Sequence, residues 1–418
     1  MHNKLKAVID ESGIWNGTRK ETHAFLLSPN VYGVTETQRQ ELSKLGHALY
    51  DCLSGLSHIA IIAYDSNLNY GGAWTLARRV FSTGVPKIYQ ELQGINVRYI
   101  PKLLKVDLMV DQNGNFKIAE IDGHNKHGLG YSTLCLRFRE ALSPETKKLP
   151  GAVKTLAEEI KRMGRAELKL FYAEQEQFYV PEFEIAKQEF YRHGINCRIV
   201  SEINADEAFV GEGLFLDLPF LYRKANLYET IIPAYKSGQV EFIIPPKPFL
   251  GAKGVMAILR NDIKNTQLEA ILLSFIKKPS LDLVRQYIPE TFLVGRKAES
   301  FKSVKEHVSG KKYVLKESIS SGMKGTVFSN SLDFEKALSV ACKSNMNWIL
   351  QEEIENQAQT FSWFENENDL KPKTADGWFM RVTTQYVNRQ LADIIITARR
   401  DKAVHGAKNC IQIGAIVL

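Results

Sequence analysis

The stretch VDLMVDQNGNFKIAEID, from Val106 to Asp122, carries the strongest short-range structural signal in the chain. Two runs rich in apolar residues flank Asn113 and Gly114, a dipeptide that favours a two-residue type I′ turn because both of its central positions need φ > 0. With the turn at these residues, Asp107 lies directly opposite Glu120. The pattern therefore predicts a β-hairpin with opposed carboxylates.

The faces of this hairpin follow from strand alternation. Successive side chains point to opposite faces, so we expect Asp122 to share the face of Glu120, Ile118 and Phe116. Directly opposed like charges destabilise a sheet, and a bound cation removes that cost. Oxygen ligands with room for water and phosphate suit Mg²⁺. We therefore expect Asp107, Glu120 and Asp122 to bind a metal ion, although an exposed acidic hairpin without a ligand remains the alternative.

Length and composition indicate a globular protein of two or three domains. The chain has 418 residues, and single cores stop growing near about 250–300 residues. Its hydrophobic fraction of 44% and charged fraction of 24% are ordinary for a soluble domain. The net charge of +7 is spread along the chain, which is a weak hint of an anionic ligand. Nucleic-acid binding is disfavoured because no basic cluster is visible.

The cysteine pattern and the apolar runs indicate in which cellular compartment the protein is expected. Five cysteines are widely spaced and no CxxC pair occurs, which argues against a disulfide framework or a zinc site and fits a reducing cytoplasm. No apolar run approaches the roughly 18 residues that span a bilayer, and the first residues lack an apolar signal core. We expect a cytoplasmic protein with no membrane partner and leave its oligomeric state open.

Three regions can be distinguished along the chain. Residues 1–150 form an N-terminal region that carries the hairpin, and within it residues 57–64 (SHIAIIAY) read as a buried strand. Residues 160–250 alternate strand and helix patterns, which predicts a small parallel-sheet α/β domain. Residues 251–418 are helical at first and then rich in strands. The fold class expected is therefore α+β or α/β.

A second segment with chemical content is KKYVLKESISSGMKGTVF, from Lys311 to Phe328. A short strand ends in Lys316, and the loop after it contains Ser321, Gly322 and Gly325. Glycines let a backbone approach a ligand closely, and a lysine supplies a point charge for phosphate. The loop lacks the Walker pattern, and GxxG is also common in plain hairpins, so a hairpin without a ligand stays open.

Two later segments add candidate ligand contacts. In the segment NWILQEEIENQ, an apolar strand ends in Gln351, Glu352 and Glu353. These residues can hold an adenine ring and ribose hydroxyls. The alternative is a strand that runs out to solvent without a ligand.

The final β-meander, with a turn expected at residues 388–389, carries Arg381 and the pair Arg399-Arg400 beside apolar strands. An ionised phosphate or carboxylate would be a suitable partner for these arginines. A structural ion pair with Asp393 would satisfy one of them equally well.

Together these segments resemble the ATP-grasp superfamily. The acidic hairpin precedes the lysine–glycine loop, an order similar to that of circularly permuted ATP-grasp enzymes such as the synthetase domain of glutathionylspermidine synthases. The resemblance implies an ATP-grasp fold with nucleotide between two β-sheet layers, beside the small α/β domain. It also implies that ATP and Mg²⁺ are the cofactors.

The resemblance assigns roles to individual residues. Asp107, Glu120 and Asp122 match the metal ligands, although Asp122 stands where the family has asparagine, so Asn125 is an alternative. Lys316 matches the lysine on the nucleotide phosphates, and residues 318–325 match the glycine loop.

Further assignments complete the nucleotide site. Residues 350–354 match the adenine hinge, and Arg399 matches an arginine near the transferred phosphate, with Arg400 as the alternative. The family's earlier phosphate lysine has three candidates, of which Lys297 is preferred over Lys253 and Lys278.

The activity implied is that of an ADP-forming carboxylate–amine ligase that works through an acylphosphate. A small-molecule kinase and a non-catalytic nucleotide-binding protein are the alternatives. The substrates would be a small-molecule or peptide carboxylate and an amine. His124, His127, Arg78 and Arg79 are candidate substrate contacts, although structural roles would explain these four equally well.

Overall fold

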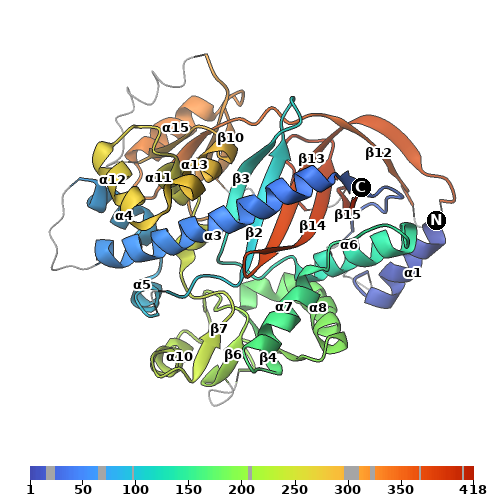
Figure 1. The fold of residues 1–418 in the computed structure, drawn as a ribbon, viewed down its shortest axis with the longest axis horizontal. Helices are drawn as coiled ribbons and strands as arrows, with labels where there is room; N and C mark the ends of the chain where they lie inside the picture. The colour runs from blue at the N-terminus through green and yellow to red at the C-terminus, as the bar shows by residue number, and fades with distance from the viewer. Residues whose placement is uncertain are drawn as a thin grey trace.

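Three β-sheets and their covering helices make up the fold (Figure 1). A computed structural model describes residues 1–15, 24–64, 72–96, 98–205, 210–295, 310–320, 325–366, 369–406 and 409–418. One sheet is mixed, one antiparallel and one parallel, so the expected combination of α+β and α/β features is confirmed at that level. The domain division at residues 150 and 250 stays a prediction.

The largest sheet joins the predicted hairpin to the C-terminal meander, which is far away in sequence. Its strand order is β1-β15-β14-β13-β2-β3, with β12 also paired to β13. Only β1 and β15 run parallel within this order. The strands are β1 (Tyr32–Val34), β2 (Leu103–Val110), β3 (Phe116–Asp122), β12 (Gln359–Trp363), β13 (Lys373–Val387), β14 (Gln390–Arg399) and β15 (Ile411–Val417). The turn at residues 388–389 is confirmed, with both residues at positive φ.

The hairpin turn itself differs from the prediction. Gly114 has a φ of 82°, but Asn113 is outside the left-handed region, and Asp111 N donates to Asn115 O at 2.9 Å around a three-residue loop. The predicted two-residue type I′ turn is therefore wrong. The Asp111 carboxylate favours the longer loop because its Oδ1 accepts from the backbone N–H groups of Asn113 and Asn115, both at 2.9 Å.

A β-bulge at Ala119 then restores the predicted pairing. The register shifts next to Asp107, and Asp107 still faces Glu120. The extra residue also reverses the alternation: Phe116 and Ile118 are buried in the core, whereas Glu120 points into a cavity. The expectation that these apolar residues share the face of Glu120 is wrong, because one inserted residue exchanges the faces.

Helix α3 (Glu36–Tyr64) crosses one face of the large sheet (Figure 1). It continues through residues 57–64, so the strand predicted there is wrong. Ile59 on this helix is fully buried in the same core as Val382 and Ile396 of the sheet. A short apolar run that is buried on all sides looks the same whether it is strand or helix, which explains the error.

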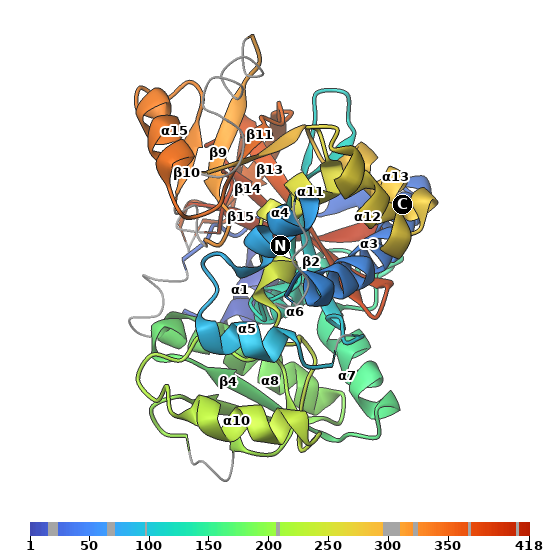
Figure 2. The same ribbon diagram turned by 90° about the vertical axis from the view of Figure 1, so that its left-hand side faces the viewer.

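The second sheet is antiparallel, with the order β10-β9-β11-β8. The two strands on either side of the lysine loop pair with each other, since Thr326 of β10 lies opposite Lys316 of β9. Figure 2 shows this sheet and α15 at the upper left of the molecule. The elements of this region are α11 (Gly254–Arg260), α12 (Thr266–Phe275), α13 (Lys278–Tyr287), β8 (Thr291–Val294), β9 (Tyr313–Glu317), β10 (Thr326–Phe328), α15 (Phe334–Lys343) and β11 (Trp348–Glu352).

The third sheet is parallel, as predicted, with the order β5-β4-β6-β7. It forms the lower part of the molecule in Figures 1 and 2. Its elements are α7 (Ala152–Arg162), β4 (Glu167–Tyr172), the 3₁₀ helix η1 (Glu174–Tyr179), α8 (Val180–Arg192), β5 (Asn196–Ser201), β6 (Gly213–Phe215), α10 (Leu227–Lys236) and β7 (Val240–Phe242). The short η2 (Pro248–Gly251) follows.

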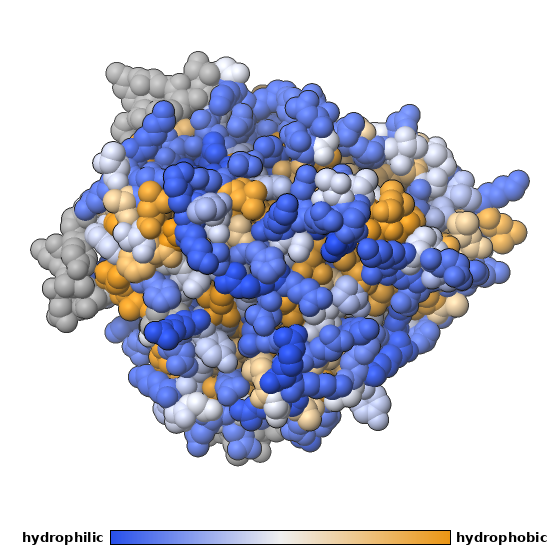
Figure 3. Space-filling view, in the orientation of Figure 1, coloured by the Kyte–Doolittle hydropathy of each residue, from blue (hydrophilic) through white to orange (hydrophobic). Residues whose placement is uncertain are grey.

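The remaining helices and the surface complete the fold. These helices are α1 (His2–Ser12), α4 (Ala73–Ser82), α5 (Lys87–Gln93) and α6 (Leu129–Leu142). The face in Figure 3 is mainly hydrophilic, with apolar residues in small separate groups. In the described part of the chain no helix has the length and apolar character needed to cross a membrane. All five cysteines are thiols rather than halves of disulfides.

Candidate functional site

A cavity of about 1390 Å³ lies where the three sheets meet. One face of the large sheet forms its first wall through β2, β3, β13, β14 and β15, and strands β9, β10 and β11 form the opposite wall. Residues that follow β4 and β6 close its remaining end. The segments singled out in the sequence therefore meet around one space.

The opposed carboxylates of the hairpin are neutralised by cations of the protein itself. Asp107 Oδ2 lies 3.2 Å from Arg381 Nη1, and its Oδ1 accepts from Thr383 Oγ1 at 2.5 Å. Glu120 Oε1 lies 3.0 Å from Lys253 Nζ. The predicted need for positive charge is met here by Arg381 and Lys253.

Asp122 lies two pairs further along the ladder than Glu120, away from the opposed carboxylates. It faces Lys105, whose Nζ lies 3.0 Å from Asp122 Oδ2. Burial raises the pKa of Asp122, but the attraction of Lys105 outweighs it and the pKa is lowered. Asn125 Oδ1 accepts from His127 N at 3.0 Å. Within the described residues no three His, Cys, Asp or Glu side chains form a metal-binding group.

Lys316 reaches across the cavity from the second sheet. Its Nζ donates to Gln351 Oε1 at 2.6 Å and to Ala119 O at 3.2 Å, at the bulge of the hairpin. Burial lowers the pKa of Lys316 to about 8. Gln351 is almost fully buried and is held in turn by Thr291 Oγ1, 3.3 Å from its Nε2.

Glu352 and Glu353 both line the cavity but have different lysine partners. Glu353 lines the cavity with a side chain only 7% exposed, and its Oε1 lies 3.5 Å from Lys402 Nζ. Glu352 is more exposed and lies 3.7 Å from Lys311 Nζ.

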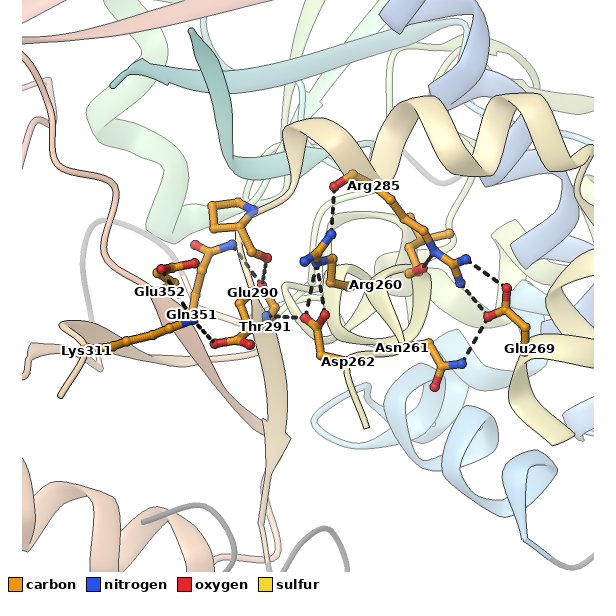
Figure 4. A network of polar contacts seen from close by, with 12 residues as sticks. Arg260, Asn261, Asp262, Glu269, Arg285, Glu290, Thr291, Lys311, Gln351 and Glu352 are labelled. Atoms are coloured by element: carbon orange, nitrogen blue, oxygen red, sulfur yellow. Dashed lines mark hydrogen bonds and ion pairs between the residues drawn. The ribbon is translucent and has the colours of Figure 1, made fainter. Parts of the chain in front are cut away.

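Figure 4 shows Gln351 and Glu352 at one end of a polar network along β8. Thr291 N donates to Asp262 Oδ2 at 2.7 Å, and Arg260 Nε lies 3.1 Å from Asp262 Oδ1. This network anchors the second sheet to the helices beneath it.

The arginines of the meander separate into different environments. Arg381 and Arg399 line the cavity, and Arg399 Nη1 lies 2.6 Å from His405 Nε2. Arg400 instead stacks on Trp363, with its guanidinium carbon 5.0 Å from the ring centroid.

The suggested structural pair of these arginines with Asp393 is wrong. Asp393 Oδ1 pairs with Arg139 Nη1 of α6 at 2.8 Å, and both side chains are fully buried. The partner of Asp393 comes from α6, a helix that packs on the sheet but is distant in sequence. Local sequence therefore does not reveal the pair.

The candidates for the earlier lysine can now be placed. Lys253 lines the cavity beside Glu120, and its Nζ also donates to Ser320 O at 2.9 Å. Lys278 is exposed and pairs with Asp282 at 2.5 Å. The preferred candidate, Lys297, lies outside the described residues.

Other predicted contacts can be located in part. Ser321 and Gly322 of the glycine loop also lie outside the described residues. Gly325 is described and has a φ of 70°. His124 and His127 line the cavity, whereas Arg78 and Arg79 belong to α4.

A buried ionic cluster at the end of the cavity was missed by the sequence analysis. Lys126 is fully buried, with its Nζ 2.8 Å from Glu176 Oε1 and 3.2 Å from Asp217 Oδ1. Both carboxylates follow strands of the parallel sheet, at the edge where such sheets bind ligands. The position of Glu176 and Asp217 just after strands was the sequence feature that could have predicted this cluster.

Comparisons with known proteins define no family for this chain. No family model and no curated protein matches the chain. Among solved structures, it is similar to a putative gamma-glutamylcysteine synthetase from Methylobacillus flagellatus KT, with 10% identity over 91% of this chain and 87% of that chain and a TM-score of 0.36. That likeness is too weak to define a fold or an activity.

Proposed function

We propose that the protein is an ATP- and Mg²⁺-dependent carboxylate–amine ligase with a circularly permuted ATP-grasp fold. The observation that carries the proposal is the cavity between two sheets, with Asp107 and Glu120 on one wall and Lys316 on the other. In the proposed reaction, a carboxylate attacks the γ-phosphate of ATP to give an acylphosphate and ADP. An amine then displaces phosphate to form an amide.

The residues present fit Mg²⁺ through two carboxylates. Mg²⁺ is commonly bound by one or two carboxylates together with substrate phosphates. Asp107 and Glu120 are adjacent across the hairpin and now pair with cations that an ATP phosphate can also attract. Asp122 joins them only if its ion pair with Lys105 opens. When bound, Mg²⁺ would supply charge neutralisation on the phosphates.

The nucleotide would lie along β9 and β11. Lys316 and Lys253 project positive charge into the cavity from different elements, as phosphate binding needs. The strand end from Gln351 to Ile354 lines the same space, and Glu353 is the candidate for the ribose hydroxyls once Lys402 moves away.

Arg381 and Arg399 would act at the transferred phosphoryl group. Both line the cavity from the face that carries the acidic pair. Arg399 is oriented by His405, so its guanidinium is positioned before substrate arrives. Positioned cations offset charge that develops on phosphoryl oxygens, so no nucleophilic side chain is required.

An ADP-release assay tests this proposal. The protein is incubated with Mg²⁺-ATP and pooled amino acids, small peptides and polyamines. We expect sustained release of ADP over many turnovers only when a carboxylate and an amine are both present, and an amide as the product. A stable phosphorylated product formed without any amine would instead identify a kinase. Nucleotide binding without turnover over the whole pool would identify a non-catalytic protein.

A further inference from the structure

The segment 400–406, which follows β14, encloses the side chain of Arg399. Arg399 Nη1 donates to His405 Nε2 at 2.6 Å and to Ala403 O at 3.4 Å, and all three residues line the cavity. The segment is itself held in shape, because Ala403 N donates to Asp401 Oδ1 at 2.9 Å. Arg399 is therefore held by a preformed part of the cavity wall.

These contacts leave part of the Arg399 guanidinium for a ligand. Nη1 carries two hydrogens, and His405 and Ala403 account for both of them. Among the described residues the side chain of Arg399 has no other hydrogen-bond partner, so its Nε and Nη2 groups are available to an anion. Arg381 lies on the neighbouring strand, two residues from the partner of Arg399 in the ladder, and therefore on the same face. An anion in the cavity can meet both guanidinium groups.

The hydrogen bond between Arg399 and His405 requires a neutral imidazole. Because Nε2 accepts from Arg399, it carries no proton, and the proton of the neutral ring is on Nδ1. Burial and the charge of Arg399 lower the pKa of His405 from its ordinary value of 6.5. The charge of Arg381 adds to this effect, whereas a backbone hydrogen bond at Gly406 and the charge of Asp401 oppose it. His405 is therefore neutral at pH 7 and gains a proton only in more acidic solution.

Protonation of His405 would break this arrangement. Both ring nitrogens would then be donors, so Nε2 could not accept from Arg399, and two cations would lie 2.6 Å apart. The other charged groups of the segment are already engaged. Lys402 Nζ lies 3.5 Å from Glu353 Oε1 on the opposite wall, and the Asp401 carboxylate accepts from the backbone of its own segment. Repulsion from the protonated ring would therefore displace the Arg399 guanidinium.

We propose that His405 is a positioning residue that makes the site sensitive to acid: its neutral imidazole holds Arg399 at the transferred phosphoryl group, and protonation of the ring releases Arg399 and stops turnover. This inference rests on the proposed ligase function for what Arg399 does. The contact between the two side chains, and its dependence on protonation, require neither ATP nor metal.

NMR of the full chain without nucleotide tests the contact. Ring ¹⁵N spectra of the wild type at pH 7, with His405→Gln to identify the signals, should show His405 Nε2 without a proton. Titration should show that Arg399→Leu raises the pKa of His405 toward 6.5, because the neighbouring cation is gone. Arg400→Leu is the matched control, since Arg400 stacks on Trp363 instead, and it should leave that pKa unchanged. A proton on Nε2 at pH 7, or the same pKa in wild type and Arg399→Leu, overturns the proposal.

Kinetics of ADP release test the positioning role. His405→Leu should lower kcat at least about tenfold at pH 7.5 and change the KM for ATP less than about threefold, as expected for an interaction made in the transition state. His405→Gln should recover most of that loss, because its side-chain oxygen can accept from Arg399 and does not titrate. The wild type should lose kcat as the pH falls below 6.5, and His405→Gln should lack this decline.

A control histidine and the combined outcomes separate this proposal from the ligase proposal. His193→Gln, which removes a histidine that pairs with Glu189 on α8, should keep the wild-type pH profile. Wild-type kcat in a folded His405→Leu, or the same acidic decline in wild type and His405→Gln, overturns the acid-sensitive role and leaves the ligase function standing. A His405 pKa that depends on Arg399, together with no ADP release, would uphold the positioning of Arg399 and contradict the ligase function.

Discussion

Lys316 on β9 and Gln351 on β11 are joined by a 2.6 Å hydrogen bond from the lysine Nζ to the glutamine side-chain oxygen. The two strands are neighbours, and both side chains line the cavity. Gln351 was expected at the adenine ring, but in the structure its oxygen orients the lysine proposed for phosphate.

Replacing Gln351 with glutamate should weaken nucleotide binding. A carboxylate in place of the amide would form an ion pair with Lys316 and reduce the positive charge available to phosphate. We expect the Kd for ADP to rise about tenfold, which corresponds to about 1.4 kcal/mol. Calorimetry measures it. Glu355→Gln is the control, since that residue is exposed and pairs with Lys312, and an equal loss in both variants would contradict the role of Gln351.

Nucleotide affinity should fall as pH rises through about 8. Burial lowers the pKa of Lys316 to about 8, so the side chain is charged below that pH and neutral above it. Bound phosphate favours the charged form, and the loss of affinity therefore begins where the free lysine loses its proton. The Kd for ADP, measured from pH 6.5 to 9.5, should therefore rise. Lys316→Arg should show a flatter profile, because arginine stays charged throughout.

Glu120→Gln should remove ATP turnover without unfolding the protein. The change deletes a charge proposed to bind the metal and keeps the shape of the side chain. That side chain is 35% exposed, so the melting temperature should change by no more than a few degrees. We expect turnover to fall at least about 100-fold, a transition-state loss of roughly 2.7 kcal/mol. Glu241→Gln, which lies on the small sheet and pairs with Arg165, is the control; full activity in Glu120→Gln would reject the metal role.

Asp393→Ala should destabilise the large sheet severely. The substitution leaves the Arg139 guanidinium buried without its carboxylate, a change that typically costs about 3–5 kcal/mol. Urea unfolding gives the free energy of unfolding. Asp282→Ala, which breaks the exposed pair with Lys278, should cost about 1 kcal/mol or less. Similar losses in the two variants would show that burial does not decide the value of the Arg139–Asp393 pair.

The hairpin shows how far local sequence predicts a site. The opposition of Asp107 and Glu120 was predicted correctly, but from a turn that the structure lacks. The Asx interaction of Asp111 lengthens the loop, and the bulge at Ala119 compensates for it. Bulges depend on packing on both faces of a sheet, which a single strand's sequence does not encode.

Contacts between residues that are distant in the chain were harder to predict from the sequence. The parallel order of the small sheet followed from alternating strand and helix patterns, but the convergence of Lys126, Glu176 and Asp217 did not. Residues 57–64 were misread for a related reason: complete burial removes the polar face that distinguishes a helix from a strand.

Titration of ATP into the protein, with Mg²⁺ and then with EDTA, tests the proposed site most directly. With two hairpin carboxylates holding the metal on the phosphates, ATP should bind the wild type at least tenfold more tightly when Mg²⁺ is present. Glu120→Gln should lose most of that difference. Equal affinity with Mg²⁺ and with EDTA in the wild type, or a full Mg²⁺ effect in Glu120→Gln, would contradict the proposal that this cavity binds metal-bound ATP.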